Sequence, residues 1–71
     1  MGNTFSVNME KVDELRLKKF WTNSELGRKA HLTQATIYSL KAKRRNANML
    51  TVKKLAAALD VSPAEIIEKQ L

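Results

Sequence analysis

The sequence predicts an all-α fold made of five short helices. Apolar residues recur at helical spacing along most of the chain, and residues that favour helix N-caps precede the apolar stretches. No segment alternates polar and apolar residues in the way a half-buried strand does. The length of 71 residues and the apolar content of 44% fit one small domain with a modest core.

The chain is predicted to begin with a flexible arm, because residues 1–7 show no clear period. Asn8 is the expected N-cap of a first helix that runs to about Lys19. Phe20 and Trp21 close this helix. We expect both aromatic residues to be core or staple residues rather than a functional pair.

A capping box at residues 22–25 predicts the second helix, because the Thr22 hydroxyl and the Glu25 carboxylate each accept a backbone N–H bond. The helix runs from about residue 23 to residue 30. Gly27 lies inside it, where glycine costs ~1 kcal/mol relative to alanine. Because helices joined by a short turn cross closely only over a small side chain, we expect Gly27 to mark the crossing. A merely tolerated glycine is the alternative.

A tight turn and a third helix follow at once. Residues 31–32 form the turn, and Thr33 caps a helix that runs over about residues 34–42. Ile37 and Leu40 stand three residues apart, so they lie on one face of this helix and anchor it to the core.

Two further helices complete the predicted fold. Asn48 caps a fourth helix, in which the apolar residues from Met49 to Leu59 form one continuous stripe. Residues 62–65 form a second capping box with Pro63 at the first helical position, where the missing N–H is not needed. A short fifth helix with apolar residues available for packing ends the chain.

The charge distribution indicates what kind of partner to expect. The net charge is +6, and the segment from Leu26 to Leu59 has eight lysines and arginines but no acid. Such segregation favours a polyanion, because lysine and arginine near phosphates displace condensed counterions. The alternative is a solvated basic face that serves solubility, and charge alone does not decide between the two.

The outward face of the third helix is polar, nearly uncharged and small at its start. These features suit contacts with base edges in the major groove of DNA, because glutamine bonds bidentately to adenine and small methyl groups contact thymine. An ordinary solvated face would more often carry several charges. The expected base-contacting residues are Gln34, Ala35, Thr36, Tyr38 and Ser39.

A basic loop follows the third helix and would lie beside the sugar-phosphate backbone in this pose. Backbone N–H groups at the start of the second helix offer another place for a phosphate. The expected phosphate-contacting residues are Thr22, Asn23, Thr33, Lys43, Arg44, Arg45 and Asn46. Residues 8–71 are therefore predicted to form a helix-turn-helix DNA-binding domain.

Two segments, TNSELGRKAHLTQATIYSLK and LAAALDVSPAEII, resemble a known family. The span from about Val12 to Ile67 resembles the lambda-repressor-like helix-turn-helix domains of the Cro and phage-repressor type, also called the xenobiotic-response-element family. The resemblance implies a compact five-helix fold and a dimer that binds a two-fold operator. It also implies that Asn23 binds a phosphate and that Gln34, Ala35 and Ser39 read bases.

Three positions depart from the family pattern. His31 stands at the turn position that is usually glycine, and histidine is among the residues enriched at positive φ, so the turn forms with some strain. Lys41-Ala42-Lys43 replaces the usual glutamate-asparagine-glycine, so we expect the third helix to extend further and the loop to be more basic. Ala47 stands where a proline is common.

The sequence therefore predicts a cytoplasmic transcription regulator, a repressor from a phage, mobile element or bacterial operon, that binds double-stranded DNA as a homodimer. The candidate dimer residues are Phe5, Ile67 and Leu71. The alternative is an antitoxin or another protein-interaction module on the same fold. One histidine and no cysteine give no pattern for an enzyme or a metal site, and no cofactor is expected. The chain has neither an apolar run of ~20 residues nor a signal-peptide pattern.

Overall fold

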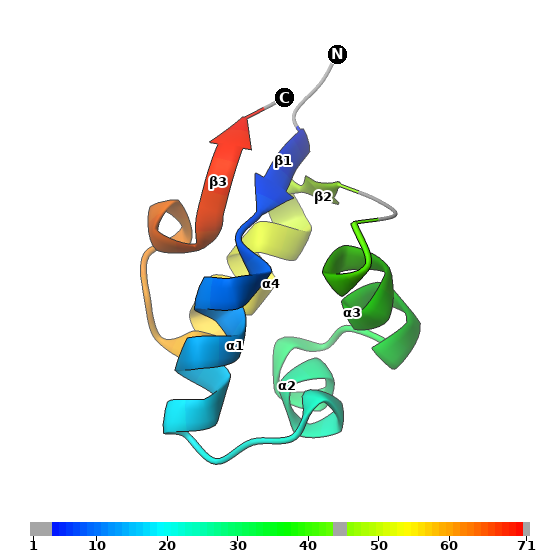
Figure 1. Cartoon of the computed structure of the whole chain (residues 1–71), viewed down its shortest axis with the longest axis vertical. Helices are drawn as coiled ribbons and strands as arrows, with labels where there is room; N and C mark the ends of the chain where they lie inside the picture. Colours follow the sequence, from blue (N-terminus) through cyan, green and yellow to red (C-terminus); the bar gives the residue numbers. More distant parts are fainter. Residues whose placement is uncertain (1–3, 44–45, 71) are drawn as a thin grey trace.

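The computed structural model describes residues 4–43 and 46–70, and this part of the chain is mostly helical (Figure 1). It consists of four α-helices, one 3-10 helix and three short strands. In chain order the elements are β1 (Thr4–Val7), α1 (Met9–Lys18), α2 (Asn23–Ala30), α3 (Gln34–Lys41), β2 (Ala47–Asn48), α4 (Met49–Leu59), the 3-10 helix η1 (Pro63–Ile66) and β3 (Ile67–Gln70). The four α-helices lie where the sequence predicts them.

Each α-helix begins at a side chain that caps it. Asn8, Thr22, Thr33 and Asn48 each accept a hydrogen bond from the backbone N–H three residues further on. Such a side chain satisfies one of the N–H groups that a helix leaves free at its start, and it contributes roughly 1 kcal/mol of stability. The predicted starts of these four helices are confirmed.

Each α-helix is followed by a residue with a left-handed backbone, and none of these residues is glycine. They are Phe20 (φ 57°), His31 (φ 58°), Lys43 (φ 60°) and Asp60 (φ 62°). Their N–H groups donate to carbonyl groups of the last helical turn, which closes the helix. The expectation that the third helix extends further is wrong, because Lys43 already has the left-handed conformation and α3 ends at Lys41.

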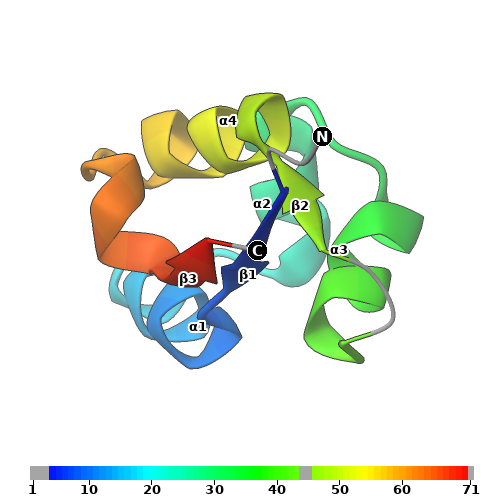
Figure 2. The ribbon, with the colours of Figure 1, turned by 90° about the horizontal axis from the view of Figure 1, so that it is seen from above.

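The two ends of the chain meet in a small antiparallel sheet with the strand order β2–β1–β3 (Figures 1 and 2). Phe5 of the central strand β1 pairs with Ala47 on one side and with Gln70 on the other. The register shifts after Ser6, so that Val7 pairs with Ile67. The sheet therefore joins the start of the chain both to its end and to the segment before α4.

This sheet corrects the all-α prediction. Residues 4–7, expected in the flexible arm, form strand β1, while residues 1–3 lie outside the described part. The predicted fifth helix is one 3-10 turn, and the chain then continues as β3. The strands are two to four residues long, too short to show alternation, and their pairing depends on tertiary context.

The core draws side chains from all four α-helices and from β1, β2 and η1. Its members are Val7, Met9, Val12, Leu26, Ala30, Ile37, Leu40, Ala47, Val52, Leu55, Ala56, Leu59 and Ile66. Trp21 packs against this core, as expected. The same expectation is wrong for Phe20, which follows α1 with a left-handed backbone and is 92% exposed, whereas the next residue packs against the core.

Two of the candidate dimer residues are engaged within the chain. Phe5 and Ile67 are partly buried and pack against the core. Leu71 lies outside the described residues. Phe5 and Ile67 therefore do not form a free apolar surface for a second copy.

Candidate nucleic-acid interface

α2 and α3 cross closely at Gly27. A Cβ atom at this position would lie 2.9 Å from the carbonyl oxygen of Leu32, a separation that real Cβ atoms essentially never show. The clash would be with the backbone of the turn, so rotating a side chain would not relieve it. The Leu32 N–H in turn donates to the Gly27 carbonyl oxygen at 2.8 Å. The predicted packing role of Gly27 is confirmed.

His31 forms the turn between these helices in a left-handed conformation (φ 58°, ψ 41°). Its N–H donates to the carbonyl oxygen of Arg28 at 3.2 Å, which ends α2. A side chain other than glycine in this conformation costs roughly 1–2 kcal/mol, because Cβ approaches the following carbonyl oxygen. The expected positive φ of His31 is confirmed, and the turn forms without glycine.

α3 presents one buried and one outward face. Ile37 is fully buried and Leu40 is 3% exposed, so the helix is anchored as predicted. In both views of the ribbon α3 lies at the outer side of the molecule (Figures 1 and 2). Of the predicted base-contacting residues, Gln34, Ala35 and Tyr38 are exposed, and Thr36 and Ser39 are half-buried. Ala35, Tyr38 and Ser39, together with Lys41 and Ala42, line an open hollow on this face.

The start of α3 is held by hydrogen bonds between neutral side chains. Gln34 Nε2 donates to Ser24 Oγ on α2. Thr33 Oγ1 accepts from the Thr36 N–H at 3.2 Å and lies 3.0 Å from Thr36 Oγ1. The side chain of Gln34 is thus tied to α2, with its amide oxygen still available to a base edge.

The start of α2 is organised by the capping box. Thr22 Oγ1 accepts from the Glu25 N–H at 3.1 Å, and the Glu25 carboxylate accepts from the Thr22 N–H at 2.8 Å. This second bond holds the pKa of Glu25 below the ordinary glutamate value. The Thr22 hydroxyl also faces the Glu25 carboxylate and helps to lower its pKa, so a phosphate would have to compete with Glu25 for the hydroxyl hydrogen. The backbone N–H of Thr22 is occupied by the same carboxylate. Asn23 follows as the half-buried first residue of the helix.

Cations surround the neighbouring Trp21 ring. The Nζ atoms of Lys19 and Lys29 lie 5.3 Å and 5.2 Å from the ring centroid, within cation–π range. These lysines add positive charge beside the start of α2. Neither lysine was among the DNA contacts predicted from the sequence.

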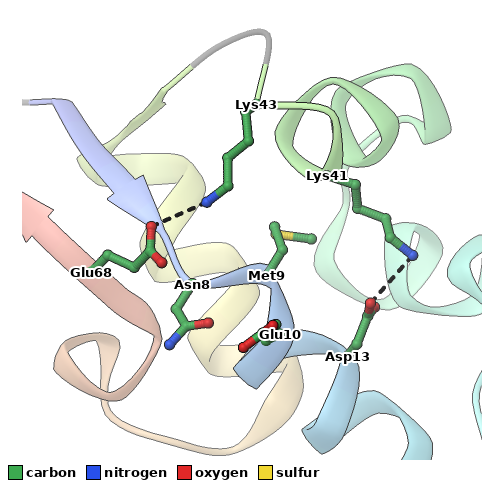
Figure 3. Close-up of a pocket in the computed structure, with 7 residues that line it drawn as sticks. All are labelled: Asn8, Met9, Glu10, Asp13, Lys41, Lys43 and Glu68. Atoms are coloured by element: carbon green, nitrogen blue, oxygen red, sulfur yellow. Dashed lines mark hydrogen bonds and ion pairs between the residues drawn. The ribbon is translucent and has the colours of Figure 1, made fainter.

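The end of α3 is basic and is held by ion pairs to two other elements (Figure 3). Lys41 Nζ lies 3.3 Å from Asp13 Oδ2 on α1, and Lys43 Nζ lies 3.1 Å from Glu68 Oε1 on β3. Both pairs border a pocket of about 390 Å³. Of the predicted phosphate-contacting residues that the structure describes, Thr22, Thr33, Lys43 and Asn46 are exposed and Asn23 is half-buried.

Arg44 and Arg45, which the sequence predicts to contact phosphates, lie outside the described residues. Three residues that bind side chains of this interface were not predicted from the sequence, namely Ser24, Asp13 and Glu68. The acids lie far along the chain from the lysines they bind, so only the fold brings them together, whereas the hydroxyl of Ser24 could have been found from its place next to Asn23.

The described residues contain no group of three or more histidine, cysteine or acidic side chains arranged for a metal ion. Within the same part of the chain, no helix has the length and apolar character needed to cross a membrane.

Comparison with known proteins agrees with this geometry. A family model described as "Helix-turn-helix" matches residues 12–66. A search of curated proteins found no match. Among solved structures, the chain is similar to the restriction-modification controller protein C.AhdI from Aeromonas hydrophila, with 28% identity, a TM-score of 0.72, and coverage of 79% of this chain and 85% of that chain.

Two further structures show the same likeness. The master regulator for biofilm formation SinR, solved in complex with DNA, is 27% identical with a TM-score of 0.71 and coverage of 78% of this chain and 89% of SinR. The hypothetical transcription factor NHTF from Neisseria is 27% identical with a TM-score of 0.72 and coverage of 80% of this chain and 66% of NHTF.

Proposed function

The chain belongs to the helix-turn-helix family of the Cro/C1 type, and on that premise we propose that it is a sequence-specific regulator of transcription, a repressor, that binds double-stranded DNA. The observation that carries this proposal is the outward face of α3. The face is polar and uncharged, and Ile37 and Leu40 anchor the helix behind it. SinR, which the chain resembles, was solved in complex with DNA.

In the proposed complex α3 lies in the major groove. Gln34 at its start reaches furthest toward the bases, and its amide oxygen and nitrogen suit adenine. Ala35, Thr36, Tyr38 and Ser39 complete the reading face. Binding to adenine requires Gln34 Nε2 to leave Ser24 Oγ or to share its two hydrogens between them, and the amide has a hydrogen for each.

The proposed phosphate contacts flank this helix on both sides. On one side stand Thr22, Asn23 and Thr33, at the starts of α2 and α3, where helix N-termini favour anions. The others follow α3 in the sequence and are Lys43, Arg44, Arg45 and Asn46, of which Arg44 and Arg45 lie outside the described residues. Such contacts fix register and affinity but carry no sequence information.

We propose further that two copies bind a two-fold operator. One recognition helix contacts only a few base pairs, and paired half-sites about one DNA turn apart raise specificity. β3 is an edge strand of the sheet, so its outer backbone groups are available to a second copy. Sedimentation of the protein alone and on selected DNA tests this proposal, and one protomer on a selected site contradicts it.

Selection of bound sites from a random duplex library tests the main proposal. The selected duplex should bind ~10³-fold or more tightly than a scrambled duplex, and affinity should fall steeply with salt. Amide shifts during titration should cluster in residues 33–46. Equal affinity for both duplexes contradicts the proposal. A repressor should lower transcription from a promoter that overlaps the selected site, and increased transcription contradicts the repressor role.

A protein-interaction module, such as an antitoxin, is the second candidate function. One observation favours it: Leu17 and Phe20 are 59% and 92% exposed at the end of α1, beside the exposed Lys18 and Lys19. Exposed apolar side chains next to lysines suit contact with an acidic protein partner. A tight complex with a protein encoded nearby, abolished by Phe20→Ala, supports this function, whereas an unchanged complex in that variant contradicts this surface.

A further inference from the structure

Glu68 places a negative charge at the basic end of α3. Its Oε1 accepts from Lys43 Nζ at 3.1 Å (Figure 3). The same oxygen accepts from Ser6 Oγ at 2.9 Å. The Lys43 ammonium holds the pKa of Glu68 below the ordinary glutamate value, so this carboxylate is ionised at neutral pH. The Glu68 carboxylate therefore connects β3 to β1 through Ser6 and to the end of α3 through Lys43.

Lys43 has contacts through both its backbone and its side chain. Its backbone is left-handed, and its N–H donates to the carbonyl oxygen of Leu40 at 3.1 Å. Its side chain reaches across the pocket toward β3 rather than away from the molecule (Figure 3). Lys41 is similarly turned toward Asp13 on α1. The fold thus directs two lysines of the basic segment toward the protein's own acids.

We propose that Glu68 limits the affinity of this protein for DNA by competing with a DNA phosphate for the Lys43 side chain. The inference rests on the proposed function, in which Lys43 contacts a phosphate. To make that contact, the ammonium either leaves Glu68 or brings the phosphate toward a carboxylate of like charge. Both routes oppose binding, and both act equally on every duplex because a phosphate contact carries no sequence information.

The size of the effect follows from the exposure of the pair. The side chains of Lys43 and Glu68 are 58% and 44% exposed, and ion pairs between such groups are weak. We therefore expect Glu68 to lower the affinity about two- to fivefold near physiological salt. Without Glu68, one additional counterion-releasing contact should steepen the slope of log K against log salt by up to about one.

Glu68→Gln tests the inference with little change in shape, because glutamine keeps an oxygen that accepts from Ser6. Glu14→Gln is the matched control: it changes the charge equally, but Glu14 lies on α1 and pairs with Lys11 at 3.9 Å. Affinity for the selected and the scrambled duplex should be measured by fluorescence anisotropy of labelled DNA at several salt concentrations. Thermal melts show whether each variant is folded.

Glu68→Gln should bind both duplexes about two- to fivefold more tightly than the wild type, and Glu14→Gln should gain clearly less. In a Lys43→Gln background, Glu68→Gln should have no further effect beyond that of Glu14→Gln. Equal gains in the two single variants would show a general charge effect and overturn the inference. A lower affinity in Glu68→Gln would also overturn it, because Glu68 would then position Lys43 for the phosphate.

The outcomes separate this inference from the proposed function. If the wild type binds both duplexes equally, sequence-specific regulation is contradicted, yet the comparison of Glu68→Gln with Glu14→Gln still decides the role of Glu68. If the wild type strongly prefers the selected duplex and Glu68→Gln leaves both affinities unchanged, the proposed function is supported and the proposed role of Glu68 is contradicted. A wild type that binds no duplex at low salt contradicts both.

Discussion

The two ends of α3 differ in charge and in the bonds that hold them. At its start, Gln34 is hydrogen-bonded to Ser24 and Thr33 to Thr36, all through neutral groups. At its end, Lys41 and Lys43 are ion-paired with acids of α1 and β3. Hydrogen bonds fix direction, whereas exposed ion pairs act through charge and are screened by salt. In the proposed complex, this difference would assign base contacts to the start of α3 and a sequence-independent effect on affinity to its end.

Removing the anchor common to both ends has the largest expected effect. Ile37→Ala should lower the free energy of unfolding by about 2–5 kcal/mol, because Ile37 is fully buried behind the reading face. Tyr38→Ala, on the exposed face of the same turn, should change stability by only about 0.5 kcal/mol. Urea unfolding followed by circular dichroism compares the two. Similar losses in both variants would show that α3 does not depend on this anchor.

Gln34→Ala tests the start of the helix. It should weaken binding to the selected duplex by about 1–3 kcal/mol and hardly change binding to scrambled DNA, because a bidentate base contact is lost. Anisotropy titrations of both duplexes provide the measurement. If the variant loses the same affinity for both, α3 does not place Gln34 at the bases.

Arg45→Ala is the comparison for the basic sequence that follows the other end, where Arg45 lies outside the described residues. It should weaken binding to both duplexes similarly and reduce the salt slope by about one, because a phosphate contact is lost. A loss confined to the selected duplex would assign Arg45 to the bases and remove the contrast between the two ends.

Two glycine substitutions separate backbone strain from side-chain function. His31 precedes α3 and Lys43 follows it, and both have left-handed backbones. His31→Gly should raise the free energy of unfolding by up to about 1 kcal/mol, because glycine adopts this conformation without the Cβ contact. DNA affinity should not change, since His31 has no proposed contact.

Lys43→Gly should relieve similar strain but lose affinity for all duplexes. Its net stability should rise less than that of His31→Gly, because the ion pair with Glu68 is lost as well. Urea unfolding and anisotropy titrations of both variants give the comparison. Unchanged DNA affinity in Lys43→Gly would remove Lys43 from the phosphate contacts.

The smallest expected effect is the dependence of stability on acid pH. The folded-state pKa values of Glu25 and Glu68 are lowered by hydrogen bonds from Thr22 and Lys43. Their contribution is therefore complete above the ordinary glutamate pKa of about 4.3 and is lost as the pH falls through the lowered values. Glu25→Gln and Glu68→Gln should each flatten the fall in melting temperature below about pH 5. An unchanged slope in both variants would contradict this assignment.

The helices were predictable because their signals are local. Thr22 and Glu25 cap α2 within one turn of helix, and Ile37 and Leu40 define the buried face of α3 by their spacing alone. The turn at His31 followed from the same local pattern. The caps bind backbone groups three positions away, and the spacing of Ile37 and Leu40 is visible within one helix, so the sequence alone was enough to predict these features.

The sheet and the ion pairs were not predictable in this way. Phe5 pairs with residues near the middle and the end of the chain, and Glu68 meets Lys43 only after β3 has joined β1. Likewise, the exposure of Phe20 depends on the backbone conformation after α1, which an aromatic residue rarely adopts. Apolar character alone therefore assigned Phe20 wrongly to the core.

The sequence by itself determined the four α-helices, their caps and the uncharged outward face of α3, because hydrogen bonds and periodicity within one helix need no distant partner. The tertiary structure alone decided that segments near both ends of the chain form a sheet and that acids from α1 and β3 pair with lysines at the end of α3. Charges that lie far apart in the sequence interact only once the chain has folded, and the proposed effect of Glu68 on DNA affinity depends on that contact.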